Sequence, residues 1–315
     1  NAIVNPNQPG CDFPHKGLAG VGVMFYLLAA LRARLQANRW FAEQGIAEPV
    51  LADWLDLVAL GTVADVAPLE RLNRILVHQG LRRIRAGPAR ARGSGGCGGA
   101  RGGGAPPGGG AWLAWPTRYP RHAVAADLGF AVGPRLNAAG RLDDMGLGIR
   151  CLLAESAAEA HGLAAQLDEL NRDRRAIEAQ MQREAEQQLE RLRLGDDLPW
   201  GLCLFDPDWH QGVVGLLAGR VRERSQRPTI AFAAAGEELK GSARSIPGLH
   251  IRDALERVAA RRPGLIRRFG GHAAAAGLTL AAENFEGFSA AFDAVVRELL
   301  APEDLELRLL HDGEL

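Results

Sequence analysis

The nonapeptide GPRLNAAGR, residues 133–141, lies between a short apolar run and a long helical pattern. Gly133 and Pro134 predict a break in regular structure at its start, since glycine is flexible and proline cannot donate a backbone hydrogen bond. The small residues that follow let the backbone approach another group closely. Arg135 and Arg141 flank them, and a guanidinium fork matches two phosphate oxygens at once. These are the groups that a phosphate-lined cleft needs, although for the stretch taken alone a turn with its arginines in solvent is the favoured interpretation.

Length and composition limit the possible classes of protein. The 315 residues are enough for two domains, and 47% of them are apolar, which supplies ample core. The formal net charge is zero, so no global basic field draws the chain to nucleic acid, and any such binding must come from local clusters. Only two of the 37 basic residues are lysines, Lys16 and Lys240, a bias typical of a GC-rich gene.

The cysteines and the hydropathy pattern bear on the compartment. The four cysteines have no paired spacing, which argues against a zinc site or a disulfide framework and fits a reducing cytosol; they are Cys11, Cys97, Cys151 and Cys203. No apolar run is long enough to span a bilayer, and no signal peptide is evident. We expect a cytoplasmic protein. The chain starts at Asn1 and stops in mid-pattern, so we also expect it to be part of a longer protein.

The first third of the chain reads as one short strand and three helices. The strand is expected at 2–4, and the helices at 18–35, 51–60 and 69–84. The first helix is apolar nearly all round, which predicts burial. Asp65 follows an apolar run and could be a metal ligand at the end of an element. On spacing alone a cap or surface aspartate fits better, because a hard divalent cation takes roughly six oxygen ligands.

Residues 86–122 differ from the rest of the chain. Twelve glycines occur from Gly87 to Gly110, and no Asp or Glu occurs from Arg71 to Ala126. Such a segment cannot bury enough apolar surface to offset its ordering entropy. One interpretation is a basic, flexible tether for nucleic acid. The interpretation that we favour is a stretch read out of frame in a GC-rich gene, which resequencing would test.

A single long helix is predicted at 155–194, where apolar residues recur every three, four, seven or eight positions. A coiled-coil dimer would be one use of such a helix. A connector between two domains fits better, because the apolar seam is thin and the regular heptads are few.

The last third predicts a second α/β unit. Strands are expected at 201–205, 229–233, 239–246, 278–280 and 305–310, and helices at 213–224, 250–260 and 285–300. The predicted fold class is therefore α/β, with two α/β domains joined by a long helix.

Three segments of this second unit place polar groups beside glycine. His210 precedes Gly212 at a strand-to-helix turn, where free backbone N–H groups attract anions. Residues 241–245 carry Ser242, Arg244 and Ser245, and in an extended strand the first two would share one face.

The third segment is Gly270-Gly271-His272, which we expect to form a bare helix N-terminus with one imidazole. Each segment alone also fits an ordinary turn or a structural histidine. Together they predict a grip on phosphate or nucleotide. The residues form no Ser-His-Asp arrangement and no P-loop, so metal-assisted hydrolysis is the expected chemistry.

The combination resembles the RecJ family of the DHH phosphoesterase superfamily. Five motifs occur in the order seen in that family, at 57–66, 133–141, 210–215, 241–245 and 270–277. The resemblance covers nearly the whole chain except 88–122. It implies a 5′→3′ exonuclease specific for single-stranded DNA, acting in DNA repair and recombination with two Mn²⁺ or Mg²⁺ ions. It also implies a monomer whose partners are single-stranded DNA with a 5′ end, a single-strand-binding protein and a helicase.

The resemblance assigns roles motif by motif. Asp65 would be a metal ligand and, with His272, a catalytic residue beside the scissile phosphate. The expected contacts to the strand and its 5′ end are Arg135, Asn137, Arg141, His210, Ser242, Arg244, Ser245, Gly270 and Gly271. The implied domains are the C-terminal part of a DHH domain (1–150), a connector helix (151–195), a DHH-associated domain (196–303) and the start of an oligonucleotide-binding barrel (304–315). A narrow cleft between the two main domains would exclude duplex DNA.

Two departures from the family pattern lower the activity expected of this chain. The family's earlier aspartate motifs and its Asp-His-His signature are absent, as is most of the barrel. A two-metal reaction needs those ligands, so we expect little or no nuclease activity from these 315 residues alone. Two alternatives remain: another DHH-family phosphodiesterase that acts on short oligonucleotides, or a non-catalytic scaffold that binds single-stranded DNA.

Overall fold

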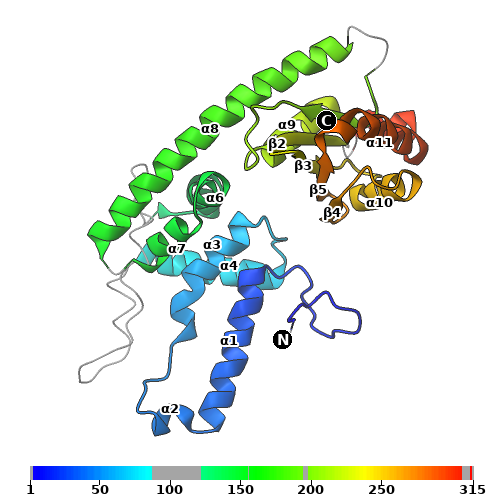
Figure 1. Cartoon of the computed structure of the whole chain (residues 1–315). Coiled ribbons are helices and arrows are strands. Elements are labelled where there is room, and N and C mark those ends of the chain that lie inside the picture. Colours follow the sequence, from blue (N-terminus) through cyan, green and yellow to red (C-terminus); the bar gives the residue numbers. More distant parts are fainter. Residues whose placement is uncertain (1–2, 87–121, 155, 194–197, 307–312, 314–315) are drawn as a thin grey trace. The chain divides into compact units, whose positions relative to one another are not determined.

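The computed structural model describes residues 3–86, 122–154, 156–193, 198–306 and 313. These residues form helices and one five-stranded sheet, and the predicted α/β class is confirmed. The chain divides into two compact units, unit 1 (Asn1–Asn171) and unit 2 (Arg172–Leu315). The sheet belongs entirely to unit 2, whereas the described residues of unit 1 form helices and turns (Figure 1).

Unit 1 is built from seven helices in its described part, followed by the first half of an eighth. The seven are α1 (Gly20–Ala37), α2 (Trp40–Glu43), α3 (Leu55–Ala64), α4 (Arg71–Ala86), α5 (Ala125–Asp127), α6 (Gly133–Leu142) and α7 (Gly146–Leu153). A 3-10 turn (Leu51–Trp54) precedes α3, and a π-helical turn (Leu128–Val132) precedes α6. The strand predicted at 2–4 is wrong for its described residues, because Ile3 and Val4 are exposed and lie in no strand.

The predicted burial of the first helix is also wrong. Gly22 is the one buried residue of α1, and several of its large apolar side chains are exposed, among them Met24, Leu27 and Leu31. Helix α1 packs mainly on α3, with further contacts to α2 and to the turn before α3. An apolar composition all round a helix carries no information about which side is covered. Only the neighbouring elements decide how much of α1 is buried.

Helices α3 and α4 pack at very short range through a glycine. A Cβ atom at Gly80 would overlap the carbonyl oxygen of Leu55 and the methyl group of Ala59. The adjoining core contains Leu76, Val77 and Ile84 of α4, which are all less than one-tenth exposed. Asn73 fixes the start of α4, where its side-chain amide donates to the carbonyl oxygens of Gly17 and Pro68, at 2.8 Å each.

The predicted break at residues 133–134 does not occur. Gly133 begins α6, and Pro134 lies in its first turn, where a missing N–H breaks no helical hydrogen bond. Gly133 instead serves packing, since a Cβ atom there would lie 3.2 Å from the Cβ of Ala64 at the end of α3. The motif at 133–141 is therefore a helix, not a turn.

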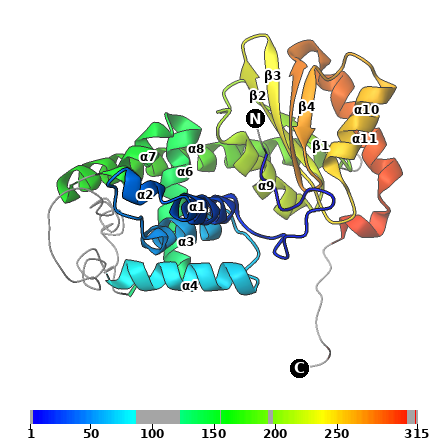
Figure 2. The ribbon, with the colours of Figure 1, turned by 90° about the horizontal axis from the view of Figure 1, so that it is seen from below.

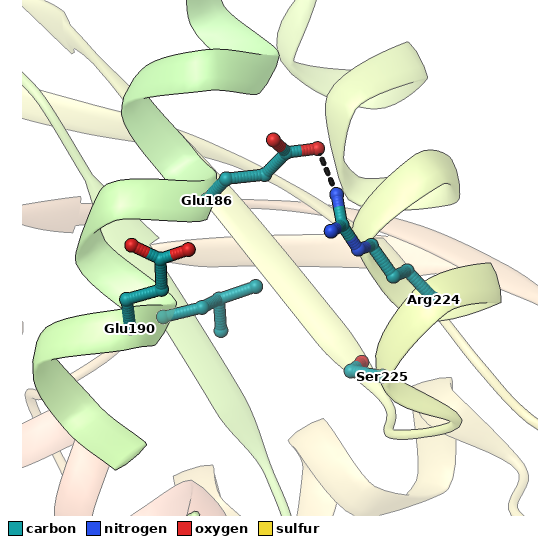
Figure 3. A pocket seen from close by; sticks show the side chains of 5 residues that line it. Glu186, Glu190, Arg224 and Ser225 are labelled. Carbon is teal, nitrogen blue, oxygen red and sulfur yellow. Dashed lines mark hydrogen bonds and ion pairs between the residues drawn. The ribbon is translucent and has the colours of Figure 1, made fainter. Parts of the chain in front are cut away.

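The long pattern at 155–194 forms one continuous helix, α8 (Ala157–Arg193). The unit boundary, after Asn171, lies within it. Its first half buries Ala164 and Leu167 in the core of unit 1, and its second half buries Met181, Ala185 and Leu189. In unit 2, Glu186 of α8 forms an ion pair with Arg224, as Figure 3 shows.

Unit 2 is a five-stranded sheet with helices on both faces. The strands are β1 (Leu202–Phe205), β2 (Thr229–Ala235), β3 (Glu238–Arg244), β4 (Arg268–Gly271) and β5 (Ala275–Ala281), in the order β1-β2-β3-β5-β4. Strands β1 and β2 are parallel and joined through α9 (Val214–Ser225), whereas the other pairs are antiparallel. Helices α10 (Ile251–Arg261) and α11 (Phe285–Leu299) enclose the main core on the face opposite α9 (Figure 2).

Several predictions fall outside the described residues. The glycine-rich segment predicted at 86–122 does so except for Ala86 and His122, and so does most of the strand predicted at 305–310. Leu305 itself ends a 3-10 turn (Pro302–Leu305). Among the described helices, none combines the length and the apolar character needed to cross a membrane.

The contact through Gly80 gives a test of how α3 and α4 pack. Alanine normally stabilises a helix interior by up to about 1 kcal/mol relative to glycine. We expect Gly80→Ala to do the opposite and to destabilise the chain by about 1–3 kcal/mol through overpacking. The matched control is Gly162→Ala in α8, where a Cβ atom meets no heavy atom within 4 Å. Denaturant unfolding of both variants checks this, and a Gly80→Ala protein as stable as the control would contradict it.

Candidate functional site

Strand β3 presents a serine and an arginine on one face of the sheet in unit 2. Leu239 and Ala243 of this strand are buried in the core with α10 and α11. Because strand residues alternate between faces, Ser242 and Arg244 point to the other side. Arg244 Nη1 donates to Ser242 Oγ at 3.2 Å and to the carbonyl oxygen of Ala243 at 2.9 Å. The shared face predicted for these two residues is thus observed, and the guanidinium is held in place.

The first turn of α9 lies directly against this pair. A Cβ atom at Gly215 would be 3.0 Å from both Ser242 Oγ and Arg244 Nη2. Any larger residue at 215 would therefore displace the hydroxyl or the guanidinium. Glycine at this position lets the N-terminal end of α9, which is the positive end of its helix dipole, approach the two side chains of β3. Most N–H groups at this end already donate to backbone carbonyl oxygens.

The loop before α9 is anchored by a buried tryptophan. Trp209 is 3% exposed, and its indole Nε1 donates to Glu184 Oε2 of α8 at 2.9 Å. The next residue, His210, is exposed, and its Nδ1 accepts a hydrogen bond from the N–H of Gly212 at 3.1 Å. A neutral His210 ring then carries its proton on Nε2. Gln211 is tied to β2 through the carbonyl oxygen of Ala234, at 3.2 Å.

A row of residues without side chains continues from Ser242 across the sheet. Ser242 pairs with Gly277 of β5, and Gly277 pairs with Gly270 of β4. Directly paired residues point to the same face, so this glycine row (Gly277 and Gly270) lies on the face that carries Ser242. Both glycines are exposed, and a Cβ atom at Gly270 would meet nothing within 4 Å. Internal packing does not require glycine at position 270, and the row leaves bare backbone that a ligand could approach.

The turn between β4 and β5 presents the second predicted imidazole. The bare helix N-terminus predicted at Gly270 and Gly271 is wrong, because both glycines lie in β4. Gly271 has a φ of 150°, and a Cβ atom there would overlap the backbone of Ala275 and Ala276. His272 is exposed, and its Nδ1 accepts from the N–H of Ala274 at 3.3 Å. Its Nε2 is therefore the nitrogen left to donate when the ring is neutral.

Ser245 differs from Ser242 in that its hydroxyl is bonded to a backbone carbonyl oxygen. Its hydroxyl donates to the carbonyl oxygen of Leu249 at 2.7 Å, and its N–H donates to Ala274 at 3.0 Å. The first bond ties the end of β3 to the loop before α10, and the second ties it to the β4–β5 turn. The geometry favours a structural role for this hydroxyl over a phosphate contact.

In unit 1, Asp65 follows the last residue of α3 and is exposed. The next residue, Val66, is 86% exposed and has a φ of 54°, the left-handed region that costs a non-glycine residue about 1–2 kcal/mol. The end of α3 packs on the π-helical turn, since a Cβ atom at Gly129 would lie 3.2 Å from Val63 Cγ1. The Asp65 motif and the 133–141 motif are thus neighbours within unit 1.

Helix α6 separates the three polar residues of its motif. Asn137 and Arg141 are one turn apart and lie on the same face. Arg135 is about 160° from Asn137 around the helix. It points to α8, where its Nε donates a hydrogen bond to Asp168 Oδ1 at 2.7 Å. Both side chains of that ion pair are about one-sixth exposed. Arg135 therefore fastens α6 to α8.

The described residues do not complete a metal site. They contain no group of three or more His, Cys, Asp or Glu side chains placed to hold one ion. Asp65 offers one carboxylate, whereas a hard divalent cation takes roughly six ligands. The residues described here consequently do not fit the two-ion site that the family resemblance implies.

Sequence reasoning missed three residues that matter locally. Gly215 and Gly277 lay inside the quoted motifs, but only the fold shows what they do. Gly215 leaves room for the Arg244 side chain, and Gly277 extends the bare face beside Ser242. Asp56, nine residues before Asp65, is 7% exposed, and burial raises the pKa of its carboxyl above the usual range. Its position within an apolar helical run was the only sequence signal.

The chain is similar to known proteins over its whole length. Residues 200–298 match the family model of the DHHA1 domain. The whole chain is 55% identical to a protein of Dickeya dadantii and 52% identical to one of Escherichia coli, both named single-stranded-DNA-specific exonuclease RecJ. In each case it covers 52% of the relative, so the chain spans about half the length of these curated relatives.

Solved structures show the same similarity. A crystal structure of RecJ in complex with Mn²⁺ from Thermus thermophilus is 32% identical, with a TM-score of 0.70 over 94% of this chain and 38% of that one. The Mg²⁺ complex from the same organism has a TM-score of 0.69 over 91% of this chain and 39% of that one. On these matches, the chain belongs to the RecJ family of the DHH superfamily.

Proposed function

We propose that this chain is the 5′-end-binding part of a metal-dependent 5′→3′ exonuclease specific for single-stranded DNA, with a role in DNA repair and recombination. The observation that carries the proposal is the bare sheet face of unit 2. There, Ser242, the guanidinium of Arg244 and the glycine row share one face, with the first turn of α9 against it. Charged donors around bare backbone are the groups that a terminal phosphate needs.

Each group has a defined part in this proposal. Arg244 binds the 5′-phosphate beside the positive end of the α9 dipole, and Ser242 orients the guanidinium. His272 donates from Nε2 to a phosphate oxygen, and His210 does the same from its loop. The glycine row lets the sugar-phosphate backbone lie against the sheet. Asn137 and Arg141 remain proposed strand contacts, and Asp65 remains a proposed metal ligand.

The ions themselves would be held mostly by residues outside this chain. Relatives of known structure were solved with Mg²⁺ or Mn²⁺, and such ions activate water and stabilise developing charge in phosphodiester hydrolysis. We propose no step through them here, because Asp65 alone does not complete a site. The contribution of the present residues is to bind and orient the strand.

Two variants of β3 test the 5′-phosphate grip. We expect Arg244→Gln to remove the preference for a 5′-phosphorylated over a 5′-hydroxyl oligodeoxynucleotide, and Ser242→Ala to weaken it. A charge-assisted hydrogen bond contributes roughly 1.5–3 kcal/mol, which is about tenfold or more in affinity. Lys240→Gln is the matched control, since it changes an exposed charge on the same face of the same strand. Fluorescence anisotropy with both oligonucleotides measures the ratio, and an unchanged preference in Arg244→Gln would refute the grip.

The glycine row gives an independent test. Gly270→Ala has room for its methyl group, so the midpoint of thermal unfolding should stay unchanged. Binding of the 5′-phosphorylated strand should nevertheless weaken, because the methyl group would cover backbone against which the strand lies. We expect a loss of roughly 1.4 kcal/mol, which is about tenfold in affinity. Gly219→Ala, which also has open space but lies in helix α9 and not in the glycine row, should bind normally. Wild-type affinity in Gly270→Ala would show that the bare backbone has no role.

The catalytic expectation is tested directly with the 315-residue chain. Incubation with 5′-phosphorylated single-stranded DNA and Mn²⁺ should release little or no mononucleotide, because Asp65 is the only predicted metal ligand present. Efficient release would contradict this expectation. Selective cleavage of dinucleotides would favour the short-oligonucleotide phosphodiesterase, and a longer parent protein that binds DNA without cleaving it would favour the scaffold.

A further inference from the structure

Helix α4 concentrates positive charge in a chain whose formal net charge is zero. Its 16 residues include five arginines and neither aspartate nor glutamate. None of these arginines belongs to the motifs discussed above. The helix lies beside α3 in unit 1, as Figure 2 shows.

The basic side chains of α4 are gathered on its solvent face. Leu76, Val77, Gly80, Leu81 and Ile84 are buried on the opposite side. The exposed residues recur at helical spacing and form what we call the α4 stripe: Arg71, Arg74, Ile75, His78, Arg82 and Arg85. At about 1.5 Å per residue, the stripe from Arg71 to Arg85 is roughly 21 Å long.

The charge of the stripe is not neutralised by carboxylates. Arg74 donates to the carbonyl oxygen of Leu69 at 3.1 Å, and Arg85 donates to that of Ala123 at 2.8 Å. Both acceptors are uncharged backbone groups. No arginine of the stripe has an ion pair within the described part of the chain. Buried Asp56 interacts with Arg83, which lies outside the stripe.

The N-terminal part of the stripe forms a shallow groove. Its lining consists of Arg71, Arg74, Ile75, His78 and Gln79. Ile75 is 49% exposed, and the His78 ring is exposed beside it. Single-stranded nucleic acid is typically bound by a positively charged groove together with flat or apolar side chains on which bases can stack.

We propose that the α4 stripe is a second binding surface for single-stranded DNA, which holds internal phosphates of the strand independently of its 5′ end. This inference rests on the proposed function, since it assumes that the chain handles single-stranded DNA. The guanidinium groups bind successive phosphates, and His78 and Ile75 contact the bases.

Acidic peptides are the other polyanions that a basic stripe could attract. Two features favour DNA. Four of the charged groups are arginines, whose rigid fork fits phosphate oxygens in pairs. The ring of His78 and the exposed side chain of Ile75 also lie among these arginines. A strand in which phosphates alternate with bases could therefore contact both the charged and the uncharged side chains.

A circular single-stranded oligodeoxynucleotide is the decisive probe, because it has no 5′ end. The test variant is Arg71→Gln with Arg82→Gln, since neither side chain has a structural hydrogen bond among those described. The matched control is Arg252→Gln with Arg257→Gln, two exposed arginines of α10 that lie among Asp253 and Glu256. Anisotropy titrations at several salt concentrations give affinity and salt dependence, and circular dichroism checks folding.

We expect the α4 variant to bind the circle about tenfold or more weakly at low salt, while the α10 variant binds like the parent. The slope of log affinity against log salt should fall in magnitude by about 1.4, since each phosphate contact on a single strand contributes about 0.7. Arg71→Lys with Arg82→Lys should keep most of that slope. Equal affinities and slopes for the α4 and α10 variants would overturn the proposal.

Two further outcomes separate this proposal from the one on which it rests. Arg244→Gln should bind the circle normally, because the circle offers no terminal phosphate. The parent chain could show no preference for a 5′-phosphorylated strand while the α4 variant still binds the circle more weakly. That outcome would contradict the proposed 5′-end grip and support the α4 surface. If the chain binds polyglutamate through α4 but not the circle, the surface belongs to an acidic protein partner and the proposal is wrong.

Discussion

The alternation of side chains along β3 is the constraint on which the unit 2 site depends. Leu239 and Ala243 are committed to the core with α10 and α11, so Ser242 and Arg244 must face the other way. A shift of one residue in the pairing with β5 would place the guanidinium in the core and a core side chain on the bare face. Core burial therefore fixes the register, and the register in turn aligns Ser242 with Gly277 and Gly270.

Glycines of the described residues fall into three groups according to why glycine stands at the position. Gly80 and Gly215 allow helices to approach a neighbouring element so closely that a methyl group would not fit. Gly271 is required by its positive φ. Gly270 has neither requirement, since it has an ordinary conformation and open space around it. Gly162 and Gly219 share that open space, so it does not by itself indicate a ligand. Gly270 differs from them because it pairs with Gly277 on the face that carries Ser242, where bare backbone is accessible beside Arg244.

The two surfaces proposed to bind phosphate are chemically distinct. The unit 2 face combines one positioned guanidinium, the positive end of the α9 dipole and bare backbone, which suits a single terminal group. The α4 stripe is a line of exposed arginines without carboxylate partners among the described residues. Such a line suits a repeating polyanion and should be far more sensitive to salt. The same residue type thus has different uses. Arg244 is held by its own strand, whereas Arg135 is an internal fastener between α6 and α8 through Asp168.

The sequence by itself determined the helices of unit 2, its strands other than β4, the long helix α8, the family, and most residues of the bare face, because local periodicity and short motifs encode these features. It missed β4, where two adjacent glycines were taken for a helix N-terminus. It could not show that residues 133–134 continue a helix, since proline in a first turn and proline in a break look alike. Nor could it show that α1 is largely exposed, because an evenly apolar helix does not indicate which side is covered. Only the tertiary structure decided that Arg135 and Ser245 are used internally and that Gly215 admits Arg244. These outcomes depend on partners far away in the sequence, and the spacing along one chain carries no record of them.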